Sequence, residues 1–421
     1  MRIVQISTST YGGAGIAAVR LNQALLDKRI DSSVITLIKT ISDPAVKVIH
    51  EWGTSVELGA SSAAQTAIKS WQKIDVDYLG RPSGLDLFTT PDSTVCLKNI
   101  SEIQQADIVH LHWVEGIVDY EEMVQALERK IIVWTLHDMN PFTGGCHYSG
   151  SCMRYMQSCG ACPQLGSEME GDVSRKNWLK KYKAIQQLNI TVVTPSRWLA
   201  KCVAQSSIFS NARVVTIPNG IPTDVFKPYD RDEVRETLQI PRNAKVVLFG
   251  AEDIANSRKG FAYLLESLKR YRAPFGQNVI LVTFGSLHPS ITIESPYQLI
   301  QLGNIDQQSY LACIYSMADV TVIPSLEDNL PNIVLESMSC GTPVIGFNIG
   351  GIPDMIEHMQ TGYIASEKNI DDLVNGIQWV LSNSTEVTQK KCRDKVLLRF
   401  SFEVLSKRMK ILYASLSTRY F

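Results

Sequence analysis

Short apolar runs rich in β-branched residues alternate with helical patterns along almost the whole chain. The runs are continuous rather than strictly alternating between apolar and polar positions, which is typical of parallel strands buried on both faces. Strands that alternate with helices predict an α/β fold in which helices cover both faces of parallel sheets.

The apolar runs fall into two sets, each sufficient for one sheet. The first set covers residues 3–6, 34–37, 108–112, 131–136 and 191–193, with a helix over residues 14–28. The second set covers residues 214–217, 246–249, 279–284, 299–302, 320–323 and 344–347. A chain of 421 residues exceeds the size at which one core stops growing. We therefore predict two doubly wound domains, residues 1–212 and 213–401.

The C-terminal stretch, residues 402–421, carries a broad apolar stripe that predicts an amphipathic helix. Its members are Val404, Leu405, Met409, Ile411 and Leu412.

Charge and hydropathy exclude several classes of protein. Lys and Arg number 41 against 42 Asp and Glu, so a nucleic-acid binder of the bulk electrostatic kind is disfavoured. No apolar run approaches the ~20 residues that cross a bilayer, and the first residues, MRIVQIS, resemble a strand rather than a secretion signal. We expect a cytoplasmic protein.

The most informative segment covers residues 324–351, PSLEDNLPNIVLESMSCGTPVIGFNIGG. A buried strand ends at Pro324, a polar loop follows, and a helical pattern runs from Pro331 to a stop at Gly341. Loop amides and a helix N-terminus together favour an anion. Asp328 and Glu336, with seven residues between them, are expected to accept hydrogen bonds from sugar hydroxyls.

A glycine-rich turn, Gly12-Gly13-Ala14-Gly15, follows the first predicted strand and opens the first helix. Its backbone can approach a diphosphate without interference from Cβ atoms. NAD binding is disfavoured, because a dinucleotide site requires an acidic residue near the end of the second strand, where this chain has Lys39.

Two cations, Arg258 and Lys259, precede Gly260 in a polar loop before a helical run. Cations stabilise the negative charge of phosphate groups, so both side chains are candidate phosphate ligands.

Three histidines lie near the ends of two neighbouring predicted strands. His137 ends the strand over residues 131–136 and could bind a sugar hydroxyl. His110 and His112 share one face of the preceding strand. There they could bind a metal, pack within the protein, or contact an acceptor substrate.

Four cysteines fall within one short loop: Cys146, Cys152, Cys159 and Cys162. In a reducing cytoplasm they suit a structural zinc, with disulfides or free thiols as the alternatives and His147 as a spare ligand. Residues 175–183 form a basic, aromatic helical pattern that could rest on anionic lipid or lie in solvent.

The segment with Asp328, seven intervening residues and Glu336 resembles the signature of retaining glycosyltransferases of family 4. Asp328 stands where that family more usually has Glu, and Ala251 stands where it usually has a phosphate-binding Arg, for which Arg258 is the candidate substitute. The resemblance implies a GT-B fold, with two Rossmann-like domains that face a central cleft and a C-terminal helix, residues 402–421, that packs back on the first domain.

The resemblance also implies transfer of a sugar from a nucleotide-diphosphate donor to a hydroxyl of a glycan or lipid-linked acceptor, without a catalytic metal, in the cytoplasm or at the inner face of the membrane. The implied catalytic residues are His137, Lys259, Asp328 and Glu336. The implied donor-binding residues are Gly12, Gly13, Arg258, Lys259, Asp328, Asn329, Leu330 and Glu336. A nucleotide-sugar epimerase of the same fold and a catalytically silent binding scaffold are the alternatives.

Overall fold

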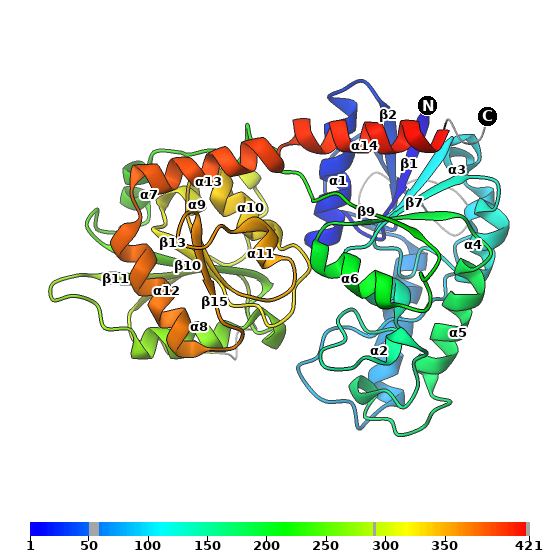
Figure 1. The fold of residues 1–421 in the computed structure, drawn as a ribbon, viewed down its shortest axis with the longest axis horizontal. Coiled ribbons are helices and arrows are strands. Elements are labelled where there is room, and N and C mark those ends of the chain that lie inside the picture. Colours follow the sequence, from blue (N-terminus) through cyan, green and yellow to red (C-terminus); the bar gives the residue numbers. More distant parts are fainter. Residues whose placement is uncertain (50–58, 289–291, 418–421) are drawn as a thin grey trace. The chain divides into compact units, whose positions relative to one another are not determined.

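The computed structural model describes residues 1–49, 59–288 and 292–417, and it divides into two compact units (Figure 1). Unit 1 combines Met1–Gly220 with Leu405–Phe421, and unit 2 is Ile221–Val404. Within the described residues, no helix combines the length and the apolar character that crossing a membrane requires.

Unit 1 is built on a seven-stranded sheet in the order β4-β2-β1-β6-β7-β8-β9, in which every neighbouring pair is parallel. Its strands are β1 (Arg2–Ile6), β2 (Asp31–Thr36), β4 (Val46–Val48), β6 (Ile108–Leu111), β7 (Ile131–Thr135), β8 (Ile190–Thr194) and β9 (Arg213–Thr216). A small antiparallel pair joins β3 (Ile38–Lys39) to β5 (Gly59–Ala60). β6 and β8 are buried along their whole length, as the continuous apolar pattern predicts for a sheet covered on both faces.

The helices of unit 1 are α1 (Gly12–Leu26), α2 (Ser62–Asp77), α3 (Ser101–Gln105), α4 (Tyr120–Leu127), α5 (Val173–Ile185) and α6 (Arg197–Gln205). α14 (Phe402–Ser417) lies mainly in unit 1, where its buried Tyr413 contacts β6 through His110. Ile411 is 62% exposed, so the predicted apolar stripe is wrong at that residue. Residues 418–421 of the predicted helix lie outside the described residues.

Unit 2 is built on a six-stranded parallel sheet in the order β12-β11-β10-β13-β14-β15. Its strands are β10 (Lys245–Asp253), β11 (Val279–Ser286), β12 (Gln298–Gln301), β13 (Val320–Ile323), β14 (Val344–Phe347) and β15 (Gly362–Ala365). Its helices are α7 (Arg231–Thr237), α8 (Phe261–Arg270), α9 (Gln308–Met317), α10 (Asn332–Ser339), α11 (Ile352–Met355), α12 (Ile370–Asn383) and α13 (Glu386–Arg399).

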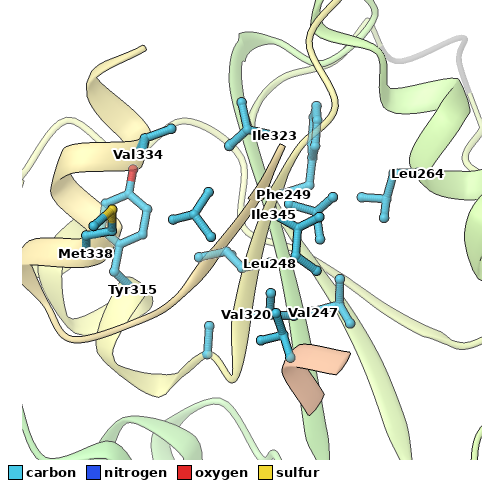
Figure 2. Close-up of a cluster of buried hydrophobic side chains, with 14 of the residues drawn as sticks. Val247, Leu248, Phe249, Leu264, Tyr315, Val320, Ile323, Val334, Met338 and Ile345 are labelled. Carbon is cyan, nitrogen blue, oxygen red and sulfur yellow. The ribbon is translucent and has the colours of Figure 1, made fainter. Parts of the chain in front are cut away.

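The core of unit 2 forms on both faces of this sheet (Figure 2). Leu264 of α8 packs on one side of the central strands, whereas Tyr315 of α9 and Met338 of α10 lie on the other side. All three side chains are buried, which fixes α10 and the loop before it against the sheet.

Helix starts follow from local side-chain capping. Ser61, Ser196 and Asp230 each accept a hydrogen bond from a backbone N–H of the helix that follows, as do Asn369 and Thr385. Such caps satisfy N–H groups that lack a partner within the helix, and each stabilises its helix by about 1 kcal/mol.

The predicted α/β fold class is confirmed, but one strand was assigned to the wrong sheet. Residues 214–217 were expected to open the second sheet, whereas β9 pairs with β8 at the edge of the first. Its apolar pattern suits either sheet, and only the pairing partner decides between them. The second unit therefore starts at Ile221 rather than at residue 213.

Candidate functional site

The charged residues predicted for unit 2 follow the carboxyl ends of two neighbouring strands. Lys259 follows β10 and Asp328 follows β13, and Gly350 follows the next strand, β14. β10 and β13 are neighbours, and the chain leaves β10 toward β11 on one side and leaves β13 toward β14 on the other, so the strand order reverses between them. In open parallel sheets, ligands bind outside the carboxyl ends of the strands at such a reversal.

An ion cluster stands at this reversal. The Lys259 ammonium donates to Asp328 Oδ2 at 2.7 Å, and Arg258 Nη1 lies 3.6 Å from the same oxygen. The Arg258 guanidinium also donates to the backbone carbonyl of Glu327 at 2.9 Å. The two cationic side chains are partly exposed, at 19% and 25%, beside a carboxylate that is 8% exposed. Two positive charges therefore meet one negative charge, which leaves the cluster with a net positive charge.

A glycine holds the cationic turn against the end of β13. Gly260 ends the 3₁₀ turn Ser257–Lys259 with φ of 72°, and a Cβ atom there would lie 1.8 Å from the carbonyl oxygen of Pro324. The backbone N–H of Leu326 donates to the Arg258 carbonyl at 2.8 Å. Only glycine permits both the left-handed backbone and this approach.

A second glycine holds the Asp328 backbone from the side of β14. At Gly350, with φ of 53°, a Cβ atom would lie 1.7 Å from the carbonyl oxygen of Asp328. The Gly351 N–H donates to that oxygen at 3.1 Å. The glycine pair at the end of the sequence segment thus positions the Asp328 loop.

α10 begins directly after this loop, with Pro331 as its N-cap. Asn329 and Leu330 are buried, and Glu336 is also buried, with Oε2 accepting a hydrogen bond from the Tyr315 hydroxyl at 2.9 Å. The N-terminal turn of α10 brings the positive end of its helix dipole to the loop that carries Asp328. Predicted helix limits at Pro331 and Gly341 agree with the structure.

The glycine-rich turn of unit 1 connects β1 to α1. α1 starts at Gly12, and its N-cap Tyr11 makes no side-chain capping bond. A Cβ atom at Gly15 would lie 2.5 Å from the Ser9 carbonyl oxygen, whereas one at Gly13 would meet nothing within 4 Å. Gly15 therefore allows close packing of the turn, and Gly13 borders open space.

Three histidine side chains form a row across the carboxyl ends of β6 and β7. His110 stacks on His112 with ring centroids 4.4 Å apart, and His112 stacks on His137 at 5.3 Å. His112 Nδ1 and His137 Nε2 are 3.0 Å apart, within hydrogen-bond distance. At the other end, the two nitrogens of His110 contact the hydroxyls of Tyr413 and Thr135 at 2.6 and 2.7 Å.

These histidines are neutral near pH 7. Burial lowers the pKa of His110 to about 3 and the pKa of His137 to about 4. Burial, together with the neighbouring imidazoles, holds the pKa of His112 well below its usual value. Each imidazole therefore has one N–H donor and one lone pair.

Asp138, next to His137, belongs to a separate buried network that the sequence did not reveal. Its Oδ2 lies 2.7 Å from His147 Nδ1, and His147 Nε2 lies 3.2 Å from the Thr89 hydroxyl. Burial opposes the charge on His147, but the Asp138 carboxylate outweighs burial and raises the pKa of the imidazole. His147 is thus occupied by Asp138 and does not serve as a spare ligand of the cysteine loop.

All four predicted cysteines line one cavity in unit 1. Cys146, Cys159 and Cys162 are buried, and Cys159 Sγ accepts a hydrogen bond from the Gly144 N–H at 3.2 Å. The nine cysteines are free thiols. Among the residues that the structure describes, no three or more His, Cys, Asp or Glu side chains are arranged to hold a metal ion.

The basic pattern over residues 175–183 forms part of α5, and several of its cations are engaged within the protein. Lys181 is fully buried and donates to both oxygens of Asn140, at 2.7 and 2.6 Å. Lys180 pairs with Asp92 and Asp119, both at 2.7 Å. Lys181 therefore cannot contribute to contact with a lipid surface.

The predicted site residues thus form two groups, one in each unit. Unit 1 contains Gly12, Gly13 and His137, and unit 2 contains Arg258, Lys259, Asp328, Asn329, Leu330 and Glu336. The sequence missed Gly350, Tyr315 and the contact between His112 and His137, although the paired glycines after the strand over residues 344–347 were a usable signal.

The second unit is similar to a known protein family. Residues 230–396 match the family model described as glycosyl transferases group 1. An uncharacterized glycosyltransferase of Methanocaldococcus jannaschii is 26% identical over 291 residues, which cover 64% of this chain and 72% of that protein. The putative colanic acid biosynthesis glycosyl transferase WcaC of Escherichia coli is 26% identical over 277 residues. These residues cover 63% of this chain and 64% of WcaC.

Solved structures share the fold over nearly the full length. Sucrose-phosphate synthase from Thermosynechococcus elongatus superposes with a TM-score of 0.69 at 18% identity and covers 99% of both chains. Anabaena Alr3699/HepE, in complex with UDP, gives a TM-score of 0.64 at 16% identity and covers 99% of this chain and 100% of its own. The chain therefore has the two Rossmann-like, parallel-sheet units of the GT-B fold, and its residues 230–396 are similar to glycosyl transferases group 1.

Proposed function

We propose that the protein is a retaining glycosyltransferase of family 4, which moves a hexose-type sugar from a nucleotide-diphosphate donor to a hydroxyl of a glycan or lipid-linked acceptor. The observation that carries the proposal is the ion cluster of Arg258, Lys259 and Asp328 at the strand-order reversal of unit 2. This cluster lies inside the segment that matches group 1 glycosyl transferases.

The residues of unit 2 suit the nucleotide-diphosphate part of the donor. Lys259 provides a point charge and Arg258 a planar fork for phosphate oxygens. The amides of Asn329 and Leu330 and the N-terminus of α10 add partial positive charge. Glu336, which is buried and oriented by Tyr315, is proposed to accept hydrogen bonds from the ribose hydroxyls.

Asp328 is proposed to bind the donor sugar. In the structure its carboxylate already pairs with Lys259, so it orients the ammonium before any ligand is present. A phosphate that approaches Lys259 shares this cation with Asp328, and a carboxylate accepts several hydrogen bonds, so Asp328 is proposed to accept from a sugar hydroxyl as well. The shorter side chain is thereby compatible with a role that Glu more usually performs in the resembled family.

Gly12, Gly13 and His137 of unit 1 are proposed as further donor contacts. Gly13 borders open space at the start of α1, so its backbone can approach phosphate oxygens. His137, neutral at pH 7, is proposed to hydrogen-bond the donor sugar.

Retention of anomeric configuration implies attack on the same face of the sugar. In that reaction the glycosidic bond to the diphosphate breaks, the acceptor oxygen bonds to the anomeric carbon, and the leaving phosphate oxygen takes the acceptor proton. The protein then contributes positioning and stabilisation of charge on the departing diphosphate rather than a base. No catalytic metal is proposed, because two cations and a helix N-terminus can meet that charge.

The proposal is tested by incubating the purified protein with nucleotide-diphosphate sugars, with and without candidate acceptors. Transfer with release of nucleoside diphosphate supports it, and the anomeric coupling constant of the product tests retention. Isomerised donor in the absence of acceptor would instead indicate an epimerase. Binding of no nucleotide by a folded protein would indicate a silent scaffold.

A further inference from the structure

One buried amide, Gln5 on β1, determines the direction of the hydrogen bonds that reach His137. β1 pairs with β6 so that Gln5 stands opposite His110, and the Gln5 side chain contacts His112 Nε2 at 3.0 Å. Gln5 and His112 are 0% and 2% exposed, so neither exchanges hydrogen bonds with bulk water. His112 in turn contacts His137. The three side chains therefore form a chain in which each member fixes the proton position of the next.

The backbone of α1 fixes how the Gln5 amide is turned. The carbonyl of Ala18 can only accept and the backbone N–H of Asn22 can only donate. These two groups bond each other within α1, because they lie four residues apart in the helix. With the amide nitrogen toward Ala18 O at 3.3 Å and the amide oxygen toward Asn22 N at 3.2 Å, each amide atom of Gln5 faces a backbone group of complementary polarity, and the oxygen also lies 3.1 Å from the Ser32 hydroxyl and 3.2 Å from the Asn22 side-chain amide. In the opposite orientation the amide nitrogen donates to Asn22 Oδ1 at 3.2 Å and to the Ser32 hydroxyl at 3.1 Å, but it then faces the Asn22 N–H, and the amide oxygen faces the Ala18 carbonyl oxygen. The two backbone groups of α1 therefore favour the first orientation.

The proton positions on the two imidazoles then follow in sequence. The Gln5 nitrogen donates to His112 Nε2, so this nitrogen carries the lone pair and Nδ1 carries the proton. His112 Nδ1 donates to His137 Nε2 at 3.0 Å, so the lone pair of His137 lies on Nε2 and its proton on Nδ1. Because His137 is neutral, this Nε2 lone pair is the only one its ring has.

We propose that Gln5 and His112 are positioning residues that hold His137 as an Nδ1–H hydrogen-bond donor whose single lone pair is occupied, so that His137 orients the donor sugar and cannot act as a base. This assignment rests on the proposed function and deepens it. It gives a reason, from side chains of this chain, for a reaction in which the acceptor proton goes to the leaving phosphate. His137 and His112 also line one cavity of unit 1 with Ala17, Leu21 and Asn219.

The test is the tautomer of each histidine, read from ¹⁵N NMR of the full-length protein labelled with ¹⁵N-histidine. Signals are assigned with His137→Gln and His112→Gln. At pH 7 without any ligand, we expect pyrrole-type Nδ1 and pyridine-type Nε2 in both rings. The reversed tautomer in His137 of the wild-type protein would overturn the inference, and this measurement does not require an active enzyme.

Gln5→Glu provides a second arm, because a carboxylate only accepts. His112 Nε2 must then donate, and the tautomers of His112 and His137 are expected to reverse together. In the transfer assay, kcat/KM is expected to fall on the order of tenfold, as for loss of one well-placed hydrogen bond. Unchanged tautomers in a folded Gln5→Glu protein whose new carboxyl group is shown by ¹³C NMR to be ionised would overturn the inference, because burial can keep a carboxyl group protonated and thus a donor.

Tyr413→Phe is the matched control. It removes the other buried partner of the histidine row, at His110, and leaves the bonds from Gln5 to His137 in place. We expect the tautomers of His112 and His137 and the value of kcat/KM to be unchanged. If the tautomers are as expected and no nucleotide sugar binds, the proposed function fails while the tautomer assignment stands, so the two failures are distinguishable.

Discussion

At the scale of single residues, Lys259 is both accessible to a ligand and held in place by an ion pair. Its ammonium is partly exposed, and it is held at 2.7 Å by a buried carboxylate whose backbone is itself held by glycine contacts. Such a cation is oriented before the ligand arrives, which lowers the entropy cost of ordering it on binding. The ion pair alone contributes little stability, because one partner remains in contact with water.

Lys259→Ala is therefore expected to remain folded and to lose transfer activity. Loss of a charge-stabilising contact to the departing diphosphate should cost roughly 2 to 4 kcal/mol of transition-state stabilisation, about 30- to 1000-fold in kcat/KM. Steady-state kinetics measure the effect. Lys390→Ala, which removes an exposed pair with Asp394 on α13, is the control and should leave the kinetics unchanged. Equal kinetics for both variants would remove Lys259 from the site.

The histidine row predicts an acid-dependent loss of stability. His110, with a pKa of about 3, and His137, with a pKa of about 4, remain neutral when folded at pH 5, whereas unfolded histidines are protonated below about pH 6.5. The unfolded state thus binds more protons, so stability is present above pH 6.5 and is lost as the pH falls toward 4. His147 has a raised pKa, so its protonation in the folded state stabilises the protein in acid. This one group is opposed by the three histidines of the row, whose pKa values are lowered.

Proton uptake on unfolding at pH 5 measures this balance. Titration of native and denaturant-unfolded protein should show that His110→Gln takes up about one proton fewer than the wild type. The stability of unit 1 should correspondingly fall less steeply with acid in the variant, by up to ~1.4 kcal/mol per pH unit. The same uptake in both proteins would contradict the neutral state of His110.

At the scale of elements, the site of unit 2 depends on turns that bring loops from different strands into contact. Gly260 and Gly350 each allow a backbone approach that a Cβ atom would block. Gly260→Ala is expected to destabilise unit 2 by about 1 to 3 kcal/mol, because the new Cβ atom clashes with Pro324 and the backbone there is left-handed. Denaturant unfolding measures this change.

Gly276→Ala separates the two causes. Gly276 has nearly the same φ, 76° against 72°, but a Cβ atom there would meet nothing within 4 Å. In this variant only the left-handed backbone should lower the free energy of unfolding, and donor binding should be retained. Gly260→Ala should lose both stability and affinity for the donor. Equal losses in the two variants would show that the contact with Pro324 is unimportant.

The cysteine loop of unit 1 keeps its predicted role as a candidate zinc site. Cys146, Cys152, Cys159 and Cys162 line one cavity, although their side chains would have to turn toward a common centre to hold an ion. Metal analysis of protein purified without chelators should find about one zinc per chain. Cys159→Ser should lose it, and Cys313→Ala, outside the loop, should retain it. A folded, metal-free protein with four titratable thiols in this loop would contradict the prediction.

At the scale of the whole molecule, the sequence predicted what depends on local pattern and failed where distant residues decide. The continuous apolar runs predicted the parallel sheets, and Pro331 and Gly341 predicted the limits of α10. β9 was placed in the wrong sheet because its pattern carries no information about its partner. Arg235 was missed, since nothing local indicates that this charged side chain is fully buried against Asp319, 84 positions away.

The site residues divide in the same way. Lys259, Asp328 and Glu336 were found from the spacing within one segment and from the charge beside a glycine. The direction of the hydrogen bonds from Gln5 to His137 could not be found, because it depends on backbone groups of α1 that only the fold brings to β1.

Calorimetric titration of the full-length protein with a panel of nucleotide-diphosphate sugars and nucleoside diphosphates, run beside Lys259→Ala, tests the central claim most directly. The account predicts saturable binding of at least one ligand to the wild-type protein and at least about tenfold weaker binding to the variant, as for loss of a charge-assisted hydrogen bond. No heat of binding to the folded wild-type protein from any member of the panel, or equal affinity in the two proteins, would contradict it.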